Sequence, residues 1–345
     1  MSDSSHAPTG ATAVQEWITG HRARFERVFF AEPGAAVAGV ARRLTARDAL
    51  IAPVDAASLR TPAVAVSYTG RLQDVGDELY LEEHRIELQD YATAAFVEIL
   101  GPTVVRFGDD RGWQTFLQDA DLARSTGILP APLVDPRVQI ADREALVAPF
   151  RPEHPTMIHV RADGRLTLGA QGVDLGSADE LDAALAVSLP RWSAFGGIVP
   201  SERLTEDLGA RPWLPRYLRA GDLARVLRIE RGSDLFSGFG CLLVDDGLAD
   251  AEPAADDPFL VVSPHDLVLA DLASRRRRRL APVTAGVVEI VQTSSTLDLA
   301  VRRVAAHAHT SEASARRLCL QALAELDVRL GSPASGSSIE TAGRV

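Results

Sequence analysis

The stretch FLVVSPHDLVLADLASRRRRRLAPVTAGVVEIVQ, residues 259–292, carries the clearest structural pattern in the chain. Two apolar runs, 259–262 and 267–270, are expected to be strands, because the Ser-Pro-His-Asp segment between them is typical of a turn. The run 276–280 is a candidate third strand, although consecutive arginines are unusual in one. Pro282 suits the first position of a helix. The stretch therefore predicts three strands followed by a helix.

Two further helices are predicted after this stretch. Ser295 and Asp298 have the spacing of a capping box, and apolar residues then recur at helical intervals. Thr310 or Ser311 is expected to cap the last helix, which should end at Gly331. The order β-β-β-α-α-α over residues 259–331 is the layout of a small winged-helix domain.

The segment before this domain, DDGLADAEPAADDP at 245–258, is acidic and poor in large apolar residues, so we expect a linker. The charge changes sign across it. The chain has a net charge of −11, but residues 259–345 hold 11 Arg and 8 acidic residues, which makes them net positive. Residues 1–258 are consequently strongly acidic, and an acidic surface repels nucleic acid and anionic membranes.

Residues 13–244 are expected to form a mixed α/β domain, which gives the chain an α+β fold. The flanking segments 1–12 and 332–345 are rich in small and polar residues and are predicted to be disordered. Within 13–244, apolar runs and turn signals predict the following elements: strands around 28–30, 50–51, 63–68 and 104–107, a hairpin over 157–168, and helices over 35–44, 91–100 and 177–187.

Several enzyme classes are excluded by composition. All 36 basic residues are Arg, so Schiff-base, P-loop and pyridoxal-phosphate chemistry lack their lysine. Gly34 and Gly39 have part of a phosphate-loop spacing, but Val40 follows instead of Lys. No zinc-ligand spacing or Gly-x-Ser-x-Gly motif occurs. We therefore predict no catalytic residue, no metal ligand and no cofactor, and we expect a protein that is not an enzyme.

The location is expected to be cytoplasmic. The N-terminus has no basic segment followed by an apolar one, so a secretory signal is not predicted. No apolar run reaches the length of a membrane span. We therefore expect no membrane partner.

The run Arg275–Arg279 has two interpretations. A charged edge strand protects a sheet from edge-to-edge aggregation. The same charges would attract an acidic peptide or a phosphate backbone. The acidic remainder of the chain disfavours nucleic acid as the partner.

The C-terminal pattern resembles the PqqD-like precursor-recognition domain of ribosomally synthesised, post-translationally modified peptide (RiPP) pathways. The similarity rests on 267–271, on the third strand ending in Leu280-Ala281, on 284–290, on 295–300 and on the last helix. It covers residues 259–331.

This resemblance implies a mechanism of recognition. A leader peptide would add as a further strand to the third strand and lie beside the last helix. The residues implied in peptide binding are Arg276, Arg277, Arg278, Arg279, Leu280, Arg316, Leu320 and Leu323. The family usually alternates apolar residues along the third strand, whereas this strand is almost entirely Arg. Either the edge prefers an acidic leader, or part of the Arg run is a turn.

The whole chain is also similar in layout to the precursor-recognition proteins of daptide biosynthesis. This similarity implies a natural-product pathway, with the precursor peptide and its modifying enzymes as partners. Two alternatives stay open at this point. The N-terminal domain could be a catalytic domain that modifies the peptide, or the winged helix could be a DNA-binding regulator.

Overall fold

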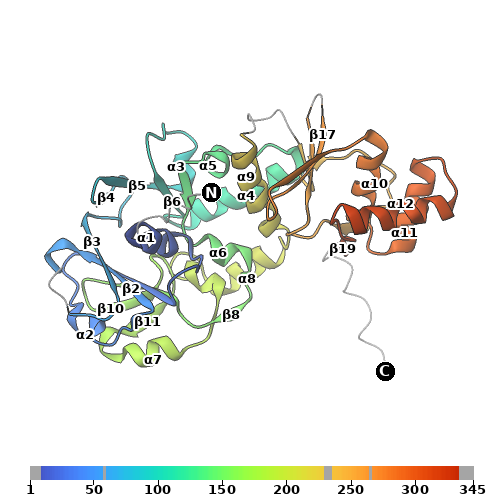
Figure 1. Cartoon of the computed structure of the whole chain (residues 1–345). Coiled ribbons are helices and arrows are strands. Elements are labelled where there is room, and N and C mark those ends of the chain that lie inside the picture. The colour runs from blue at the N-terminus through green and yellow to red at the C-terminus, as the bar shows by residue number, and fades with distance from the viewer. Residues whose placement is uncertain (1–8, 57–59, 229–234, 264–265, 334–345) are drawn as a thin grey trace, which may run out of the picture. The chain divides into compact units, whose positions relative to one another are not determined.

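The computed structural model describes residues 9–56, 60–228, 235–263 and 266–333. Over these residues the chain combines helices with β-sheets, as expected for a mixed α and β protein (Figure 1). It forms two compact units. The first contains Met1–Leu117 and Asp135–Gly209, and the second contains Gln118–Val134 and Ala210–Val345.

The first unit is built on one large sheet, whose order is β11-β10-β9-β1-β2-β3-β4-β5-β6-β7. Its strands are β1 (Arg27–Ala31), β2 (Asp48–Pro53), β3 (Val64–Gly70), β4 (Glu78–Leu81), β5 (His84–Asp90), β6 (Thr103–Arg106), β7 (Val138–Ile140), β9 (Met157–Val160), β10 (Arg165–Leu168) and β11 (Asp174–Ser177). Strands β9, β1, β2 and β3 run parallel, as do β5, β6 and β7. Short strands β8 (Pro152–Glu153) and β12 (Leu189–Pro190) pair with each other.

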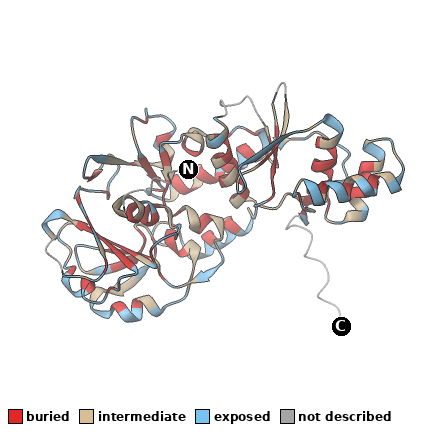
Figure 2. Cartoon of the chain, viewed as in Figure 1, coloured by how far each residue is buried: buried red, intermediate tan, exposed pale blue. Residues whose placement is uncertain are grey.

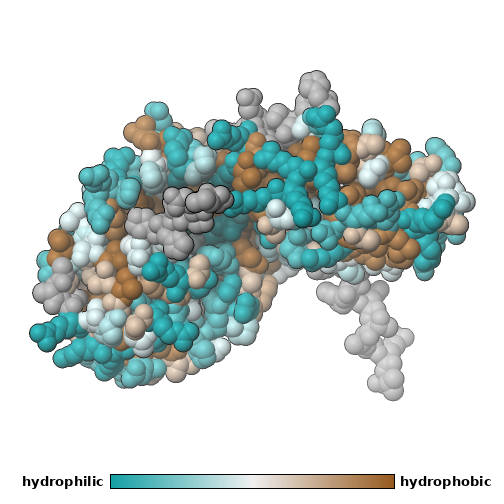
Figure 3. Space-filling view, in the orientation of Figure 1, coloured by the Kyte–Doolittle hydropathy of each residue, from teal (hydrophilic) through white to brown (hydrophobic). Residues whose placement is uncertain are grey.

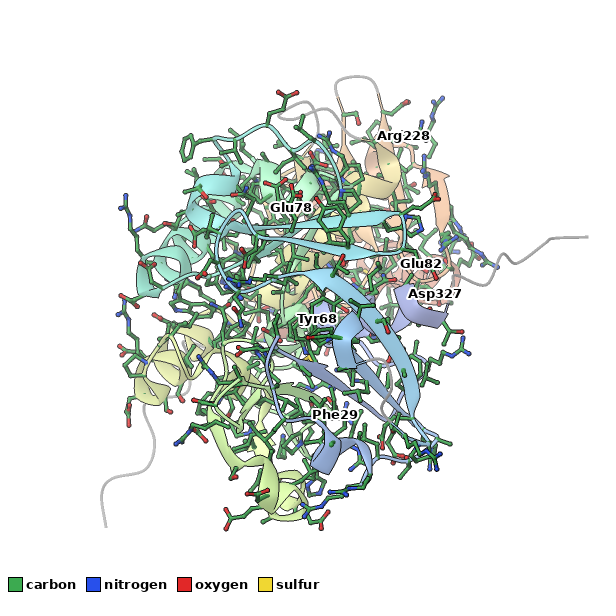
Figure 4. The ribbon with its side chains drawn as sticks, turned by 90° about the vertical axis from the view of Figure 1, so that its left-hand side faces the viewer. Phe29, Tyr68, Glu78, Glu82, Arg228 and Asp327 are labelled. Carbon is green, nitrogen blue, oxygen red and sulfur yellow. The ribbon has the colours of Figure 1, made fainter. Side chains whose placement is uncertain are left out.

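Alternate residues of the central strands face two separate cores, as the two-residue period of a strand requires. Phe30 and Tyr68 pack with helix α1 (Thr9–Thr19) in one core, whereas Phe29 belongs to the core on the opposite face. Figure 4 labels Phe29 and Tyr68 on this sheet. The other helices of this unit are α2 (Ala38–Ala41), α3 (Tyr91–Ala94), α6 (Arg143–Val147), α7 (Leu181–Ala186) and α8 (Ser201–Gly209), with 3₁₀ turns at Val54–Ala56, Ala178–Glu180 and Arg191–Phe195.

The second unit is built on a five-stranded sheet of order β14-β13-β16-β17-β18. Its strands are β13 (Leu235–Ser237), β14 (Gly240–Cys241), β16 (Phe259–Val262), β17 (Leu267–Asp271) and β18 (Arg276–Arg279), with β15 (Ala251–Glu252) and β19 (Ser332–Pro333) paired separately. Its helices are α5 (Ala131–Val134), α9 (Leu214–Leu227), α10 (Pro282–Gln292), α11 (Leu297–His307) and α12 (Glu312–Glu325). Helix α4 (Asp110–Thr126) contributes to both units.

The predicted order of elements from residue 259 onward is the observed one. Three antiparallel strands, β16, β17 and β18, precede α10, α11 and α12. Leu269 of β17 packs with apolar residues of these helices. Figure 2 shows the helices with buried inner sides and exposed outer sides, as expected for amphipathic helices around a core.

The predicted linker lies within the second unit. Strand β15 is part of the segment 245–258, and its Ala251 and Glu252 pair with β19. Arg216 of α9 is 1% exposed and donates to the carbonyl oxygens of Ala254 (2.7 Å) and Asp257 (2.9 Å). The prediction of a spacer between two domains was therefore wrong, because buried polar groups hold the segment in place.

The termini also differ from the prediction where the structure describes them. Residues 9–12 were expected to be disordered, but they begin α1, in which Ala13, Val14, Trp17 and Ile18 form a buried stripe. Residues 332–333 form β19. The rest of the predicted disordered segments, 1–8 and 334–345, lies outside the described residues.

Three predicted helices are shorter in the structure. The segment 91–100 is helical only over α3, since Phe96 of the next turn is 87% exposed and gains no packing. The segment 35–44 is helical only over α2. The last helix ends at Glu325 rather than at Gly331, and Asp327 there adopts a positive φ of 57°. Figure 4 labels Asp327.

Candidate functional site

The Arg run contains both a turn and a strand. Arg275 has a φ of 55°, the left-handed conformation of a turn residue. Asp271 stabilises this turn, because its carboxylate accepts the amides of Ala273 (3.0 Å) and Ser274 (3.2 Å). Residues Arg276–Arg279 then form β18, which pairs with β17 and ends the strand order of the sheet. All four arginines of β18 are exposed.

The backbone of β18 offers free groups on its outer side. The Leu280 amide donates to the Leu267 oxygen of β17 at 2.8 Å. Backbone groups of successive residues in an antiparallel strand point to opposite sides. Arg276 and Arg278 therefore face β17, while the N–H and C=O groups of Arg277 and Arg279 point outward. The backbone bonds of the described residues give these outward groups no partner.

The side chains of β18 divide between the two faces of the sheet. Arg278 is paired with Leu269, on the face of α10–α12, and donates to the backbone oxygen of Glu325 at the end of α12. Arg277 is on the other face, and its guanidinium lies 3.4 Å from the Val226 oxygen of α9. The bond from Arg278 places one end of β18 beside the C-terminus of α12, where backbone carbonyls attract a cation.

Arg279 is the member of the strand with a charged partner. Its Nε and Nη2 atoms each lie 3.0 Å from a carboxylate oxygen of Asp266. For Arg276, the side-chain bonds of the described residues include no partner. The strand therefore keeps most of its positive charge available to an incoming group.

The three candidate groove residues on α12 lie at different depths. Arg316 points toward α11, because its Nη2 is 2.6 Å from Asp298 Oδ1. Leu320 is 47% exposed, and Leu323 packs against the helical core. No hydrogen bond or ion pair within the described residues joins these three to β18. Figure 3 shows a hydrophilic stripe at the β17–β18 hairpin and apolar surface on the helices.

A second site, in the first unit, was not predicted from the sequence. It is a polar cavity of about 520 Å³ at the carboxyl ends of the parallel strands β1 and β9. The residues that line it are Glu32, Gln73, Asp74, Arg106, His159, Arg161, Ala170, Gln171, Gly172, Gly197 and Ile198.

Glu32 and His159 lie together at the buried side of this cavity. His159 Nε2 is 3.2 Å from Glu32 Oε1, and both residues are less than 8% exposed. The His159 imidazole, with the Ala162 amide at 2.8 Å from Oε2, holds the pKa of Glu32 at about 2 against the opposing effect of burial. Glu32 is consequently ionised at neutral pH. The rings of Trp17 and Phe30 pack edge-on against the His159 ring, with distances between ring centroids of 5.9 and 5.5 Å respectively.

Asp142 is another buried carboxyl of the same unit. It lines a small cavity that shares Arg106 and Ala170 with the larger one. Burial raises the pKa of Asp142 to about 7, although Arg106 and Arg22 act in the opposite direction. Burial also lowers the pKa of Arg106. Asp142 is thus a buried carboxyl between two half-buried guanidiniums, beside a mostly apolar cavity, and perturbed groups of this kind are frequent at functional sites.

The sequence carries little signal for this cavity. Glu32 directly precedes the Pro33-Gly34 turn, and this position after a buried strand is the one local indication. The remaining residues come from separate segments that only the fold brings together. The structure describes no cluster of His, Cys, Asp or Glu able to hold a metal ion within residues 9–56, 60–228, 235–263 and 266–333. Over the same ranges, none of the helices is long and apolar enough to cross a membrane.

Comparisons with known proteins add no assignment to these two sites. No protein-family model matches the chain, and neither a curated protein nor a solved structure matches it.

Proposed function

We propose that the second unit binds the leader of a ribosomally synthesised precursor peptide by strand addition to β18. The observation that carries this proposal is the exposed edge of β18, where the backbone groups of Arg277 and Arg279 point outward. An extended peptide that pairs with this edge would satisfy them. The similarity of residues 259–331 to PqqD-like recognition domains supports the same mode of binding.

The energetics favour an acidic peptide. Pairing with the two outward-facing residues provides up to four backbone hydrogen bonds, worth about 2–6 kcal/mol in total. A micromolar affinity requires about 8 kcal/mol, before the cost of ordering the peptide. Side chains must supply the difference. Four exposed guanidiniums beside the new strand would provide it through carboxylates of the leader.

In this proposal the protein is a non-catalytic adaptor in the cytoplasm. It presents the precursor to the modifying enzymes of its pathway, as the similarity to daptide recognition proteins implies. Leu320, which is 47% exposed on α12, would contact apolar side chains of the leader. The chain itself would require no cofactor for this role.

The test is fluorescence anisotropy of the full-length protein with labelled leader peptides from the short precursors encoded beside its gene. The full chain is needed because the sheet includes β13 and β14, which precede residue 259. Arg277→Pro removes an outward N–H while leaving the bonds to β17, whereas Arg277→Ala removes only the side chain. We expect the Pro variant to lose at least about tenfold more affinity than the Ala variant.

Three outcomes would contradict the proposal. The first is that no precursor leader binds. The second is that the Pro and Ala variants bind equally well, which would exclude strand pairing at this edge. The third is that duplex DNA binds more tightly than any leader at physiological salt. Incubation of the precursor with this protein alone should leave the precursor mass unchanged.

A further inference from the structure

The cavity of the first unit lies where open α/β sheets bind ligands. Strand β1 pairs with β2 on one side and with β9 on the other, so the chain leaves β1 in one direction and returns beside it much later. Crevices at the carboxyl ends of strands at such a switch point are the usual ligand sites of these sheets. Glu32 follows β1 and Arg161 follows β9, and both line the cavity.

The size of the cavity fits a small molecule. Its volume of about 520 Å³ lies within the range of small-molecule pockets and exceeds that of a few water molecules. The rim includes exposed Asp74 and Arg161, while Glu32 and His159 are buried. A ligand that enters the cavity would therefore displace water and contact charged groups both at the exposed rim and at the buried end.

The charges of the lining are balanced. Glu32 and Asp74 are carboxylates, and Arg106 and Arg161 are guanidiniums. A ligand whose charges are all of one sign would be attracted by one of these pairs, the carboxylates or the guanidiniums, and repelled by the other. A ligand that carries one group of each sign can satisfy both pairs.

Hydrogen-bonding groups indicate where each end would bind. Glu32 is ionised, with the Ala162 amide at Oε2 and His159 beside Oε1, and the Gln73 side chain is a further hydrogen-bond partner. Gln171 donates to the Phe107 oxygen, and its own oxygen is buried without a partner among the described residues. These acceptors favour an amine. Arg106 has a long contact of 3.4 Å to the Leu72 oxygen, which leaves most of its donors for an anionic group.

We propose that this cavity binds a small zwitterion of amino-acid to dipeptide size. Its amine would lie against Glu32 and Gln171, and its carboxylate against Arg106 and Arg161. This site is distinct from the edge of β18 and gives the first unit a binding role of its own. Either proposal can fail without the other.

The test is calorimetric titration of the full-length protein with the twenty free amino acids and a panel of dipeptides. For each ligand that binds, the N-acetyl form lacks the ammonium group and the amide form lacks the carboxylate. We expect both blocked forms to bind at least about tenfold more weakly than the zwitterion. Arg161→Met should weaken binding by a similar factor, and its exposed position makes a folding defect unexpected.

Glu32→Gln provides the second arm, with far-ultraviolet circular dichroism to verify the fold of this buried variant. Glu83→Gln and Arg111→Met are the matched controls, because each removes an exposed charge of the first unit outside the cavity. Both controls should bind like the native protein. The proposal is overturned if no panel member binds at about 10 mM, if blocked forms bind equally well, or if both cavity variants retain full affinity.

Discussion

Arg303 of α11, which is buried, and Asp246 of the acidic segment, which is exposed, form a bidentate ion pair. Arg303 Nε lies 2.8 Å from Asp246 Oδ2, and Nη2 lies 3.1 Å from Oδ1. The guanidinium is 1% exposed and also donates to Thr293 and Ser294. Because one partner belongs to the segment expected to be a linker, this pair joins that segment to the C-terminal helices.

Removing the Asp246 side of this pair should destabilise the second unit. Asp246→Ala leaves a buried guanidinium without its counter-charge, although its bonds to Thr293 and Ser294 remain, and we expect a loss of about 1–3 kcal/mol. Urea unfolding of the full chain, followed by circular dichroism, measures the effect. Asp245→Asn, an exposed neighbour, is the control and should change stability by less than about 0.5 kcal/mol. Equal stabilities of the two variants would show that the ion pair is not needed.

The three C-terminal helices α10, α11 and α12 were predictable because their apolar residues recur at helical intervals, as in the buried stripe that includes Val287, Ile290 and Val291 of α10. Caps gave the starts of two of them: Ser311 accepts the Ser314 amide, and Pro282 opens α10. The cap of α11 is Thr296 rather than the predicted Ser295, a shift of one residue. Helices can therefore be predicted from the sequence where local periodicity and capping residues mark them.

Neither the boundary between the two units nor the cavity could be predicted from local periodicity or capping. Arg216 joins α9 to residues near 257, and one buried polar contact leaves no periodic trace in the sequence. Composition alone therefore made the acidic segment resemble a spacer. The cavity groups Glu32, Arg106 and His159 come from three separate strand regions, and their proximity depends on the sheet order rather than on spacing.

Asp142 should make stability depend on pH. Burial raises its pKa to about 7, so the folded protein keeps this proton up to near neutrality while the unfolded chain loses it near pH 4. Stability should therefore fall as the pH rises from about 4 to 7. Asp142→Asn suits the positive φ of 52° at this position and removes the titration.

We expect the Asn variant to be more stable than the native protein by about 2 kcal/mol at pH 8, with the difference small at pH 4. Urea unfolding across this pH range measures both curves. Asp182→Asn, an exposed residue of α7, is the control and should follow the native curve. An Asn variant with the native pH dependence would contradict the assignment to Asp142.

Gly221 should be intolerant of alanine although it lies inside helix α9. Alanine normally stabilises a helix by about 1 kcal/mol relative to glycine. A Cβ at Gly221, however, would lie 2.3 Å from Leu133 Cγ, and Leu133 is 2% exposed. Overpacking of this kind costs about 1–3 kcal/mol, so Gly221→Ala should lower the thermal midpoint. Gly39→Ala in α2, where no atom lies within 4 Å of the new Cβ, should not lower it.

The Arg run should also keep two copies of β18 from pairing with each other. An exposed edge strand is a template for association, and like charges placed opposite one another oppose it. Arg277→Thr with Arg279→Thr removes two of the four charges, retains good strand residues and leaves the contact of Arg278 with Glu325 in place. We expect this variant to self-associate at lower concentration than the native protein, as measured by sedimentation velocity.

Arg317→Thr, an exposed change on α12, is the control and should sediment like the native protein. Raising the salt should move the native protein toward the behaviour of the double variant, because screening weakens the same repulsion. If the double variant and the native protein sediment alike at every concentration and salt level, repulsion along β18 is not what keeps this edge unpaired.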